Sequence, residues 1–177
     1  MYLSALIVAF LAIGGPSFAE APPNYDVPEG FNIPVGQTFP DFELESYEGE
    51  TKSLGAFSGS LVVLNFYTTH CGPCHRDVPA LNKFQSANPK VELVSVTPDD
   101  RDLVKDFVAR SALNGSILMN AQHYFDSWGV EFFPSFAVIG PDGTLLGATY
   151  GNRLGGEDGT VTADGLEEWV ESLVGEI

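Results

Sequence analysis

Hydrophobic and polar positions along the chain alternate in a pattern that predicts strands and helices in turn. Two runs, 61–67 and 91–96, are apolar at most positions, as expected of strands buried on both faces of a sheet. Weaker strands are expected at 39–44, 116–119, 136–139 and 144–150, the last two joined as a hairpin. Apolar residues at helical spacing predict helices at 75–86, 99–108, 121–128 and 164–174. This order indicates an α/β protein with a mixed sheet covered by helices.

The first 32 residues differ from the rest of the chain. Residues 2–13 are almost wholly apolar, a Gly-Gly-Pro sequence ends this run, and small residues at Ser17 and Ala19 suit a signal peptidase. We therefore expect residues 1–19 to be a signal peptide, 20–32 a Pro-rich linker and 33–177 one domain. The apolar run is shorter than the ~20 residues that cross a bilayer, so no stable membrane span is expected after processing. No Lys or Arg precedes the run, which leaves an uncleaved anchor or a mis-assigned start codon open.

The charge balance bears on possible partners. The chain carries 24 acidic and 8 basic residues, a formal net charge of −16, and no basic cluster. This balance argues against nucleic acids and anionic lipid surfaces as partners. The acidic residues are scattered singly, which is typical of a solvated surface, although a basic protein partner would be favoured electrostatically.

Candidate chemistry centres on Cys71-Gly72-Pro73-Cys74, the only two cysteines of the chain. They lie between the end of a predicted buried strand and the start of a predicted helix. The free N–H groups and partial positive charge of a helix N-terminus favour thiolate over thiol. A purely structural disulfide is the weaker alternative, because a bridge that closes so short a loop removes little entropy from the unfolded chain. The motif therefore indicates reversible dithiol–disulfide chemistry.

Several segments in this order resemble one known family. They are residues 35–42 (VGQTFPDF), residues 64–74 with Pro79 beyond them, and Phe133-Pro134-Ser135 continuing to the turn at 141–143. From about residue 33 to 174 the chain resembles the thioredoxin fold, and it is most similar to the exported thioredoxin-like proteins of the TlpA and ResA type. One position departs from the family: His70 stands where a Trp usually precedes the first cysteine. This departure changes the expected partner-docking surface, because His can be cationic.

Position in the predicted helix and the resemblance together assign roles to residues around the motif. Cys71, at the helix start and the more exposed of the two positions, would attack a partner's disulfide as the nucleophile. Cys74, one turn into the helix, would resolve the mixed disulfide. The resemblance implies the roles of the next residues. Pro134 would follow a cis peptide bond beside the cysteines and, with Phe133, would border the substrate groove. The substrate-binding surface would be completed by Gly72, Pro73 and His70.

Acidic and imidazole groups near the cysteines are further candidates. Asp77 lies three residues after Cys74 on the same helical face, where the resembling proteins carry a Glu, so it could accept the proton of the buried thiol. The alternative is an exposed acid favourable near a helix N-terminus. Asn65 stands where thioredoxin has a buried acid and cannot act as a base. His70 and His75 could stabilise the Cys71 thiolate if protonated, or could be exposed bystanders.

Two other functions remain compatible with the motif. Cys71 to His75 reads C-x-x-C-H, the attachment sequence of c-type haem, with Met119 or His123 as a second axial ligand. A copper carrier would bind Cu(I) with the two thiolates plus a His or Met. A strand before the motif and hairpin signals far downstream favour the thioredoxin-like interpretation over both.

We therefore expect a thiol–disulfide oxidoreductase with no cofactor and no metal site, acting as a monomer on disulfides of partner proteins. The Gly-Pro dipeptide between the cysteines is that of reducing thioredoxins, which implies a reductant re-reduced by an upstream redox protein. The resemblance further implies a periplasmic or otherwise exported location, membrane-anchored if the N-terminus is not cleaved. It also implies apocytochrome c (cytochrome c biogenesis) or copper-site assembly proteins as substrates.

Overall fold

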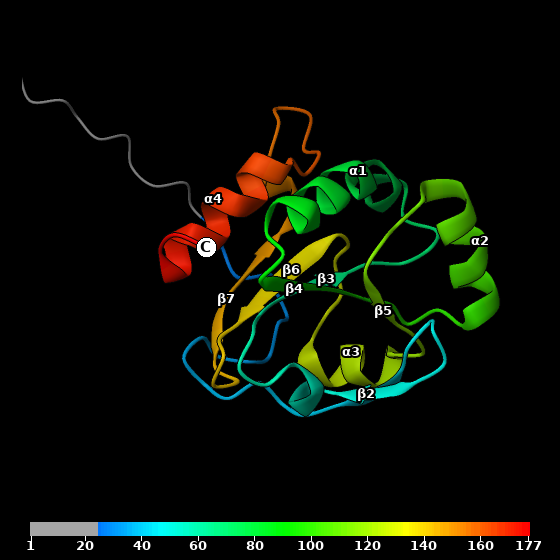
Figure 1. Ribbon diagram of the computed structural model, residues 1–177, viewed down its shortest axis with the longest axis horizontal. Coiled ribbons are helices and arrows are strands. Elements are labelled where there is room, and N and C mark those ends of the chain that lie inside the picture. The colour runs from blue at the N-terminus through cyan, green and yellow to red at the C-terminus, as the bar shows by residue number, and fades with distance from the viewer. Residues whose placement is uncertain (1–24) are drawn as a thin grey trace, which may run out of the picture.

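A five-stranded mixed sheet in the order β5-β4-β3-β6-β7 forms the centre of the molecule (Figure 1). The computed structural model describes residues 25–177, so the predicted signal peptide and residues 20–24 of the predicted linker lie outside the described residues. The strands are β1 (Glu43–Glu45), β2 (Thr51–Ser53), β3 (Leu61–Phe66), β4 (Val91–Val96), β5 (Ser116–Leu118), β6 (Ser135–Ile139) and β7 (Leu145–Tyr150). The α-helices are α1 (Gly72–Ala87), α2 (Arg101–Ser111), α3 (Gln122–Trp128) and α4 (Ala163–Val174).

The two most apolar strands occupy the middle of the sheet, as their sequences predict. Strand β3 runs parallel to β4 and antiparallel to β6, and every residue from Val62 to Phe66 is buried. The exception to apolarity is Asn65, which is paired in register with Ser95 and donates a hydrogen bond of 3.1 Å from Nδ2 to the Ser95 hydroxyl. A buried amide is tolerated there because it has a partner. The C-terminal end of β3 is therefore held rigidly, and it leads directly to the cysteine motif.

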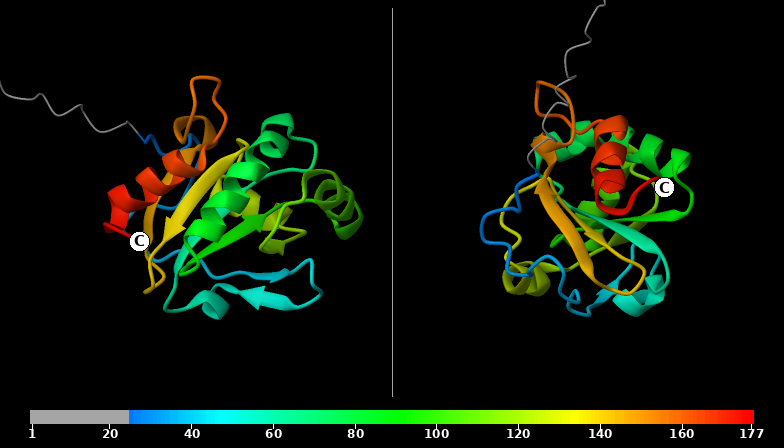
Figure 2. Two further views of the ribbon diagram at one scale, coloured as in Figure 1. Left: turned by 45° about the horizontal axis from the view of Figure 1, so that its top comes forward. Right: turned by 90° about the vertical axis from the view of Figure 1, so that its left-hand side faces the viewer.

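Helices and short elements cover both faces of the central sheet (Figure 2). A hydrophobic core lies on each face. Helices α1 and α4 pack against each other on one face of the sheet, and Phe107 of α2 belongs to the same core. Helix α3 and the small β1–β2 sheet cover the opposite face, where Phe39, Phe42 and Phe66 surround the indole of Trp128. The aromatic residues of the sequence thus fill both sides of the sheet and fix its position between the helices.

Both outer strands of the central sheet are hydrogen-bonded by the chain's own N-terminal part. Residues 36–39 run beside β7, with main-chain hydrogen bonds of 2.8 Å from Gly36 to Leu145 and from Leu145 to Gln37. Further along, the end of β1 pairs with β5: Tyr47 donates to Ile117, and Met119 donates to Glu45, each at 2.9 Å. The segment between residues 36 and 47 therefore covers part of each edge of the sheet.

The structure shifts the helix starts from the positions that the sequence predicts, by two residues for α2 (Arg101 instead of 99) and by one for α3 (Gln122 instead of 121). Helix α1 begins at Gly72 instead of His75, because Cys71 caps it, and it continues through Pro79. Helix α4 begins at Ala163 with Thr162 as its cap, instead of Asp164, since the Thr162 hydroxyl accepts the Gly165 N–H at 3.0 Å. The β1–β2 pairing is an element that the sequence pattern did not reveal. Within residues 25–177, no helix combines the length and apolarity needed to cross a membrane.

Candidate active site

The two cysteines form a disulfide at the junction between β3 and α1, with their Cα atoms 5.3 Å apart. Cys71 is the N-cap of α1, and its sulfur accepts the main-chain N–H of Cys74 at 3.2 Å. Pro73 stands in the first helical turn, where its missing N–H costs no hydrogen bond. Cys74 is only 3% exposed, whereas Cys71 is half-buried. An attacking sulfur from another molecule can therefore reach Cys71 more easily than Cys74.

The peptide bond between Phe133 and Pro134 is cis, as the resemblance implies. Gly151, directly after β7, donates its N–H to the carbonyl of Pro134 at 2.8 Å. A Cβ atom on Gly151 would lie only 2.6 Å from Cγ of Pro134, so this close approach requires glycine. Within residues 25–177, the main-chain N–H and C=O of Phe133 make no hydrogen bond to another main-chain group.

Asp77 is buried in the interior, with 1% of its surface exposed, which rules out the alternative of an exposed acid. Its Oδ1 accepts the main-chain N–H of Val161 at 3.0 Å, whereas Oδ2 has no hydrogen-bond partner among the described residues. Burial raises the pKa of the Asp77 carboxyl above its ordinary value, and the nearby charge of Asp158 adds to this effect. The Val161 N–H and the Arg76 charge oppose the shift. Asp77 follows Cys74 by one turn on the same side of α1.

The loop before Cys71 is fixed by a polar network. Nε2 of His75 lies 3.1 Å from the carbonyl oxygen of Thr69, and because a carbonyl only accepts, this nitrogen carries the proton. The His75 ring also stacks on Phe107 of α2, with ring centroids 4.3 Å apart. The Asp99 carboxylate accepts the Thr69 N–H at 2.6 Å. His75 therefore contacts both the loop and α2 instead of standing free in solvent, while His70 is exposed beside the disulfide.

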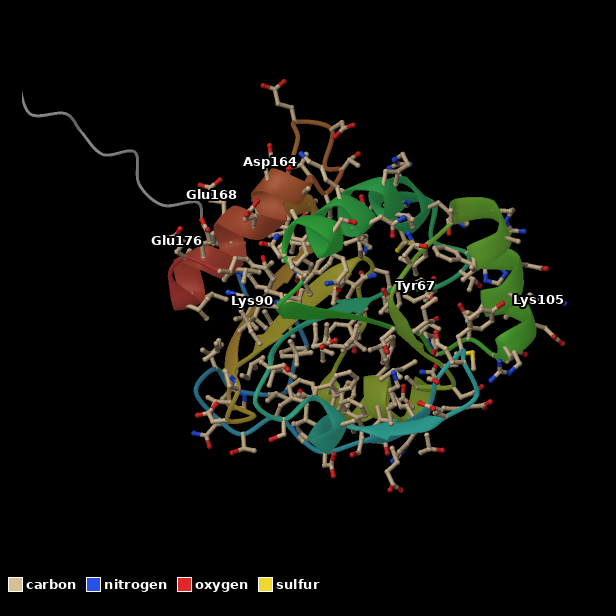
Figure 3. The ribbon with its side chains drawn as sticks, viewed as in Figure 1. Tyr67, Lys90, Lys105, Asp164, Glu168 and Glu176 are labelled. Atoms are coloured by element: carbon tan, nitrogen blue, oxygen red, sulfur yellow. A yellow bond between two sulfur atoms is a disulfide. The ribbon has the colours of Figure 1, made fainter. Side chains whose placement is uncertain are left out.

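Tyr67, labelled in Figure 3, directly follows β3 and begins the connection to this loop. It is 1% exposed, and its ring packs against Phe107 at a centroid distance of 4.9 Å. Burial raises the pKa of the Tyr67 phenol far above its usual range, and the charge of Asp99 raises it further. Tyr67 is therefore a neutral, structural neighbour of the site at any pH near neutrality.

A groove of about 410 Å³ opens beside the disulfide. Pro73 and Arg76 of α1 form one side, and residues 132–134 and Tyr150 form the floor. The third side comes from Asn152, Asp158 and Gly159. We call this cavity the proline groove. Its lining includes Pro73, Phe133 and Pro134, which the sequence analysis named for substrate binding, and Arg76, Tyr150 and Asp158, which it did not single out.

The wall carrying Asp158 belongs to a short hairpin at residues 154–162, here called the acidic hairpin. Gly155 pairs with Val161, and Thr162 donates its N–H to Leu154 at 2.9 Å. The sequence predicted only a Gly-rich acidic loop at 152–160. Its Gly-Glu-Asp-Gly run at 156–159, between Leu154 and Val161, is a hairpin signal that could have identified it. The hairpin projects beyond α1 and α4 (orange in Figure 1).

Residues named for the haem and copper alternatives are spread through the molecule. Met119 is fully buried in the core around α1, and His123 is exposed on α3, on the opposite side of the sheet. His75 already binds Thr69 and packs on Phe107. Within residues 25–177, no three His, Cys, Asp or Glu side chains are grouped so that they could hold a metal ion. This placement favours dithiol–disulfide chemistry at Cys71 and Cys74.

Comparison with known proteins agrees with this geometry. Residues 35–147 match the model of the AhpC/TSA family. The thiol-disulfide oxidoreductase ResA of Geobacillus thermodenitrificans is 30% identical over 145 residues, which cover 80% of this chain and 79% of that protein. A secreted Mycobacterium tuberculosis disulfide oxidoreductase, homologous to E. coli DsbE, superposes with a TM-score of 0.62 at 25% identity, covering 75% of this chain and 96% of that one. StoA of Bacillus subtilis superposes with a TM-score of 0.60 at 24% identity, covering 75% and 97%.

The disulfide at the start of α1 and the cis proline agree with this similarity to thiol-disulfide oxidoreductases. The chain belongs to the AhpC/TSA family and, within the thioredoxin superfamily, is a thiol–disulfide oxidoreductase of the TlpA/ResA type.

Proposed function

We propose that this protein reduces disulfides in partner proteins, with Cys71 as nucleophile and Cys74 as resolving thiol. The observation that carries the proposal is the difference between the two sulfurs: Cys71 is half-buried at the helix N-terminus, and Cys74 lies beneath the surface. Only the outer sulfur is placed to attack another molecule, and the helix dipole stabilises its thiolate. The structure is that of the oxidised state, the product of this reaction.

The reaction proceeds through two exchanges. The Cys71 thiolate attacks one sulfur of the substrate disulfide, forms a mixed disulfide with it and expels the other sulfur as a thiolate. Cys74 then loses its proton and attacks the Cys71 sulfur, which releases the second substrate thiolate and forms the Cys71–Cys74 bond. The substrate gains two electrons and two protons, and the protein dithiol loses them. Because the chain has no further cysteines, a dithiol of an upstream redox protein must restore it.

Asp77 is proposed to accept the proton that Cys74 releases. Its raised pKa brings the carboxylate closer to the range in which it can take up a proton near neutrality. Its position, one turn after Cys74 and on the buried side of α1, supports this role. Oδ2 has no hydrogen-bond partner among the described residues, so its lone pairs are available to accept the proton.

Substrate binding is proposed to use the main-chain groups of Phe133 in front of Pro134, together with Gly72, Pro73 and the exposed His70. A chain laid along Phe133 would bring its cysteine beside Cys71. The family resemblance supports an exported or periplasmic location with a signal peptide at 1–19, a linker at 20–32 and a monomeric domain at 33–177. It also supports apocytochrome c or copper-site assembly proteins as the substrates.

Substitution of each cysteine tests the mechanism. We expect Cys71→Ser to reduce insulin disulfides only at the uncatalysed rate, because the nucleophile is gone. Cys74→Ser should instead accumulate a mixed disulfide with its substrate, visible by non-reducing electrophoresis. Carried out in the native host, the Cys74→Ser trap also names the substrate by mass spectrometry. A Cys74→Ser protein with full turnover would contradict the mechanism.

The direction of electron flow is tested by the reduction potential. Equilibration of the wild-type protein with glutathione buffers should give a value closer to thioredoxin's, about −270 mV, than to that of the oxidant DsbA, about −120 mV. A value near the latter would turn the proposal from a reductant to an oxidant and leave the exchange mechanism intact.

A further inference from the structure

The acidic hairpin is a built part of the molecule instead of a loose connection. Leu154 and Val161 are 1% and 2% exposed, and the Val161 N–H is bonded to the buried Asp77 carboxylate on α1. A Cβ atom on Gly155 would lie 2.2 Å from the carbonyl oxygen of Thr160, so the two arms approach as only glycine permits. These contacts hold the tip of the hairpin at a fixed place beside the proline groove.

The proline groove is lined by aromatic residues and by two charged side chains, Asp158 and Arg76. Phe132 is 45% exposed and packs edge-on against Tyr150, at a centroid distance of 5.7 Å. Asp158 lines the groove, with Glu157 next to it at the hairpin tip. The N–H of Glu29 donates a hydrogen bond to the Tyr150 hydroxyl at 2.6 Å, which places Glu29 next to Tyr150. An exposed aromatic floor and a charged rim are the usual composition of a binding surface.

The charges at the rim are not neutralised by ion pairs. Arg76 is the basic residue that lines the groove, yet no ion pair joins it to Asp158 within 4.0 Å. Among the described residues the ion pairs are Lys83–Asp164, Arg101–Glu45 and Arg153–Asp26. The Asp158 carboxylate, which lines the groove, and the neighbouring exposed Glu157 therefore have no ion-pair partner among the described residues. Hydrogen bonds from Thr160 hold the pKa of Asp158 below its ordinary value, so this charge persists in mildly acidic solution.

We propose that the proline groove selects disulfide-bearing segments that carry a lysine or arginine within a few residues of the target cysteine, with Asp158 and Glu157 binding the cation. This inference rests on the proposed function, since it concerns what the same site reduces. A segment laid against Phe133 would place an apolar side chain on Phe132 and Tyr150, and a neighbouring cation at the hairpin tip. The groove is the size of a small-ligand pocket, which suits a short segment instead of a whole domain face.

Two short peptides test this selection. They are identical except for Lys or Glu two residues after a cysteine, which is held in a mixed disulfide with nitrothiobenzoate as the reporter. The reduced wild-type protein should reduce the Lys peptide with a kcat/KM roughly fivefold higher, the size expected of partly exposed charge pairs. The double variant Glu157→Gln/Asp158→Asn should bring the ratio close to one. The amide oxygen that this variant carries at position 158 can still accept the Thr160 N–H, which Asp158 Oδ1 accepts at 3.0 Å, so the turn is preserved.

A matched variant and a neutral substrate complete the design. Asp164→Asn/Glu168→Gln removes two exposed acids from α4 and should leave the peptide ratio unchanged (Figure 3). Hydroxyethyl disulfide, which has no charge, reports the dithiol chemistry alone. If the wild type reduces it while the two peptides react equally, the selection is refuted and the proposed function stands. If hydroxyethyl disulfide is not reduced, the proposed function itself fails. A faster reaction of the Glu peptide would also refute the proposal and assign selection to Arg76.

Discussion

The carboxyl group of Asp77 lies between α1 and the acidic hairpin, where water cannot solvate its charge. Its one hydrogen bond, from Val161, offsets part of the cost of burial, and the unpartnered Oδ2 leaves the rest. Asp77 therefore links α1, the helix that follows Cys71, to the acidic hairpin beside the proline groove. It also makes the stability of the native protein depend on pH.

The sign of this dependence follows from the raised pKa of Asp77. The native carboxyl takes up its proton at a higher pH than the unfolded one, whose pKa is near 3.8. The group's contribution to the free energy of unfolding is therefore greatest below the unfolded pKa and is lost as pH rises through the native pKa. Each unit between the two pKa values corresponds to about 1.4 kcal/mol at neutral pH.

We expect Asp77→Asn to remove this dependence. Urea unfolding of the oxidised proteins across the acidic range should show the stability of Asp77→Asn increasing relative to wild type as pH rises toward neutrality. The buried amide brings its own cost, but this cost does not change with pH, so the slope is the measurement. Asp106→Asn, at an exposed position on α2, is the control and should follow the wild type. Parallel curves for Asp77→Asn and wild type would contradict the assignment.

The spacing of residues predicted where Asp77 stands on α1 but could not predict that it is buried. Its partner Val161 is 84 positions away along the chain, and no local pattern signals that contact. By contrast, the relative exposure of Cys71 and Cys74 was predictable. Both residues belong to one turn at the start of α1, and the geometry of that turn indicated which sulfur lies outward. Properties set within one element were predictable, and those set by two distant segments were not.

At the scale of elements, the contact between the end of β7 and the start of β6 supports the site. Gly151 and Pro134 approach so closely that a methyl group would overlap the proline ring. We expect Gly151→Ala to displace Pro134, lowering stability by about 1–3 kcal/mol and reducing kcat/KM for insulin disulfides. Chemical denaturation and the insulin assay measure the two effects. Gly55→Ala adds a methyl group in ordinary contact with Ser53 and serves as the control. Wild-type stability and activity in Gly151→Ala would show that the chain around Pro134 accommodates the methyl group, and would contradict the prediction.

The elements themselves were predicted to different degrees. The positions of β3 and β4 followed from their apolar runs, because a strand buried on both faces leaves a strong pattern. The starts of α1 and α4 were wrong by one or a few residues, since a capping Cys or Thr side chain decides them. The β1–β2 pairing and the acidic hairpin were missed. Both are short and are stabilised by cross-strand contacts, so no periodic pattern of apolar residues marks them in the sequence.

At the scale of the whole molecule, the net charge of −16 opposes the folded state. Exposed acids such as Asp164, Glu168 and Glu176 follow one another along α4 and its end (Figure 3). We expect the melting temperature to rise by several degrees between about 0.01 M and 0.15 M salt, over which the screening length falls from about 30 Å to about 8 Å. Scanning calorimetry measures this effect. Sodium chloride and sodium bromide should act alike at equal ionic strength if screening is the cause, and a melting temperature that falls with salt would contradict it.

The segments at residues 36–39 and 45–47, which lie along β7 and β5, affect how the protein interacts with partner proteins. An incompletely folded polypeptide has main-chain N–H and C=O groups without hydrogen-bond partners. An uncovered edge strand would pair with it as an additional strand and promote aggregation. Because residues 36–47 cover part of both edge strands, β5 and β7, nonspecific strand pairing is blocked where these edges are covered.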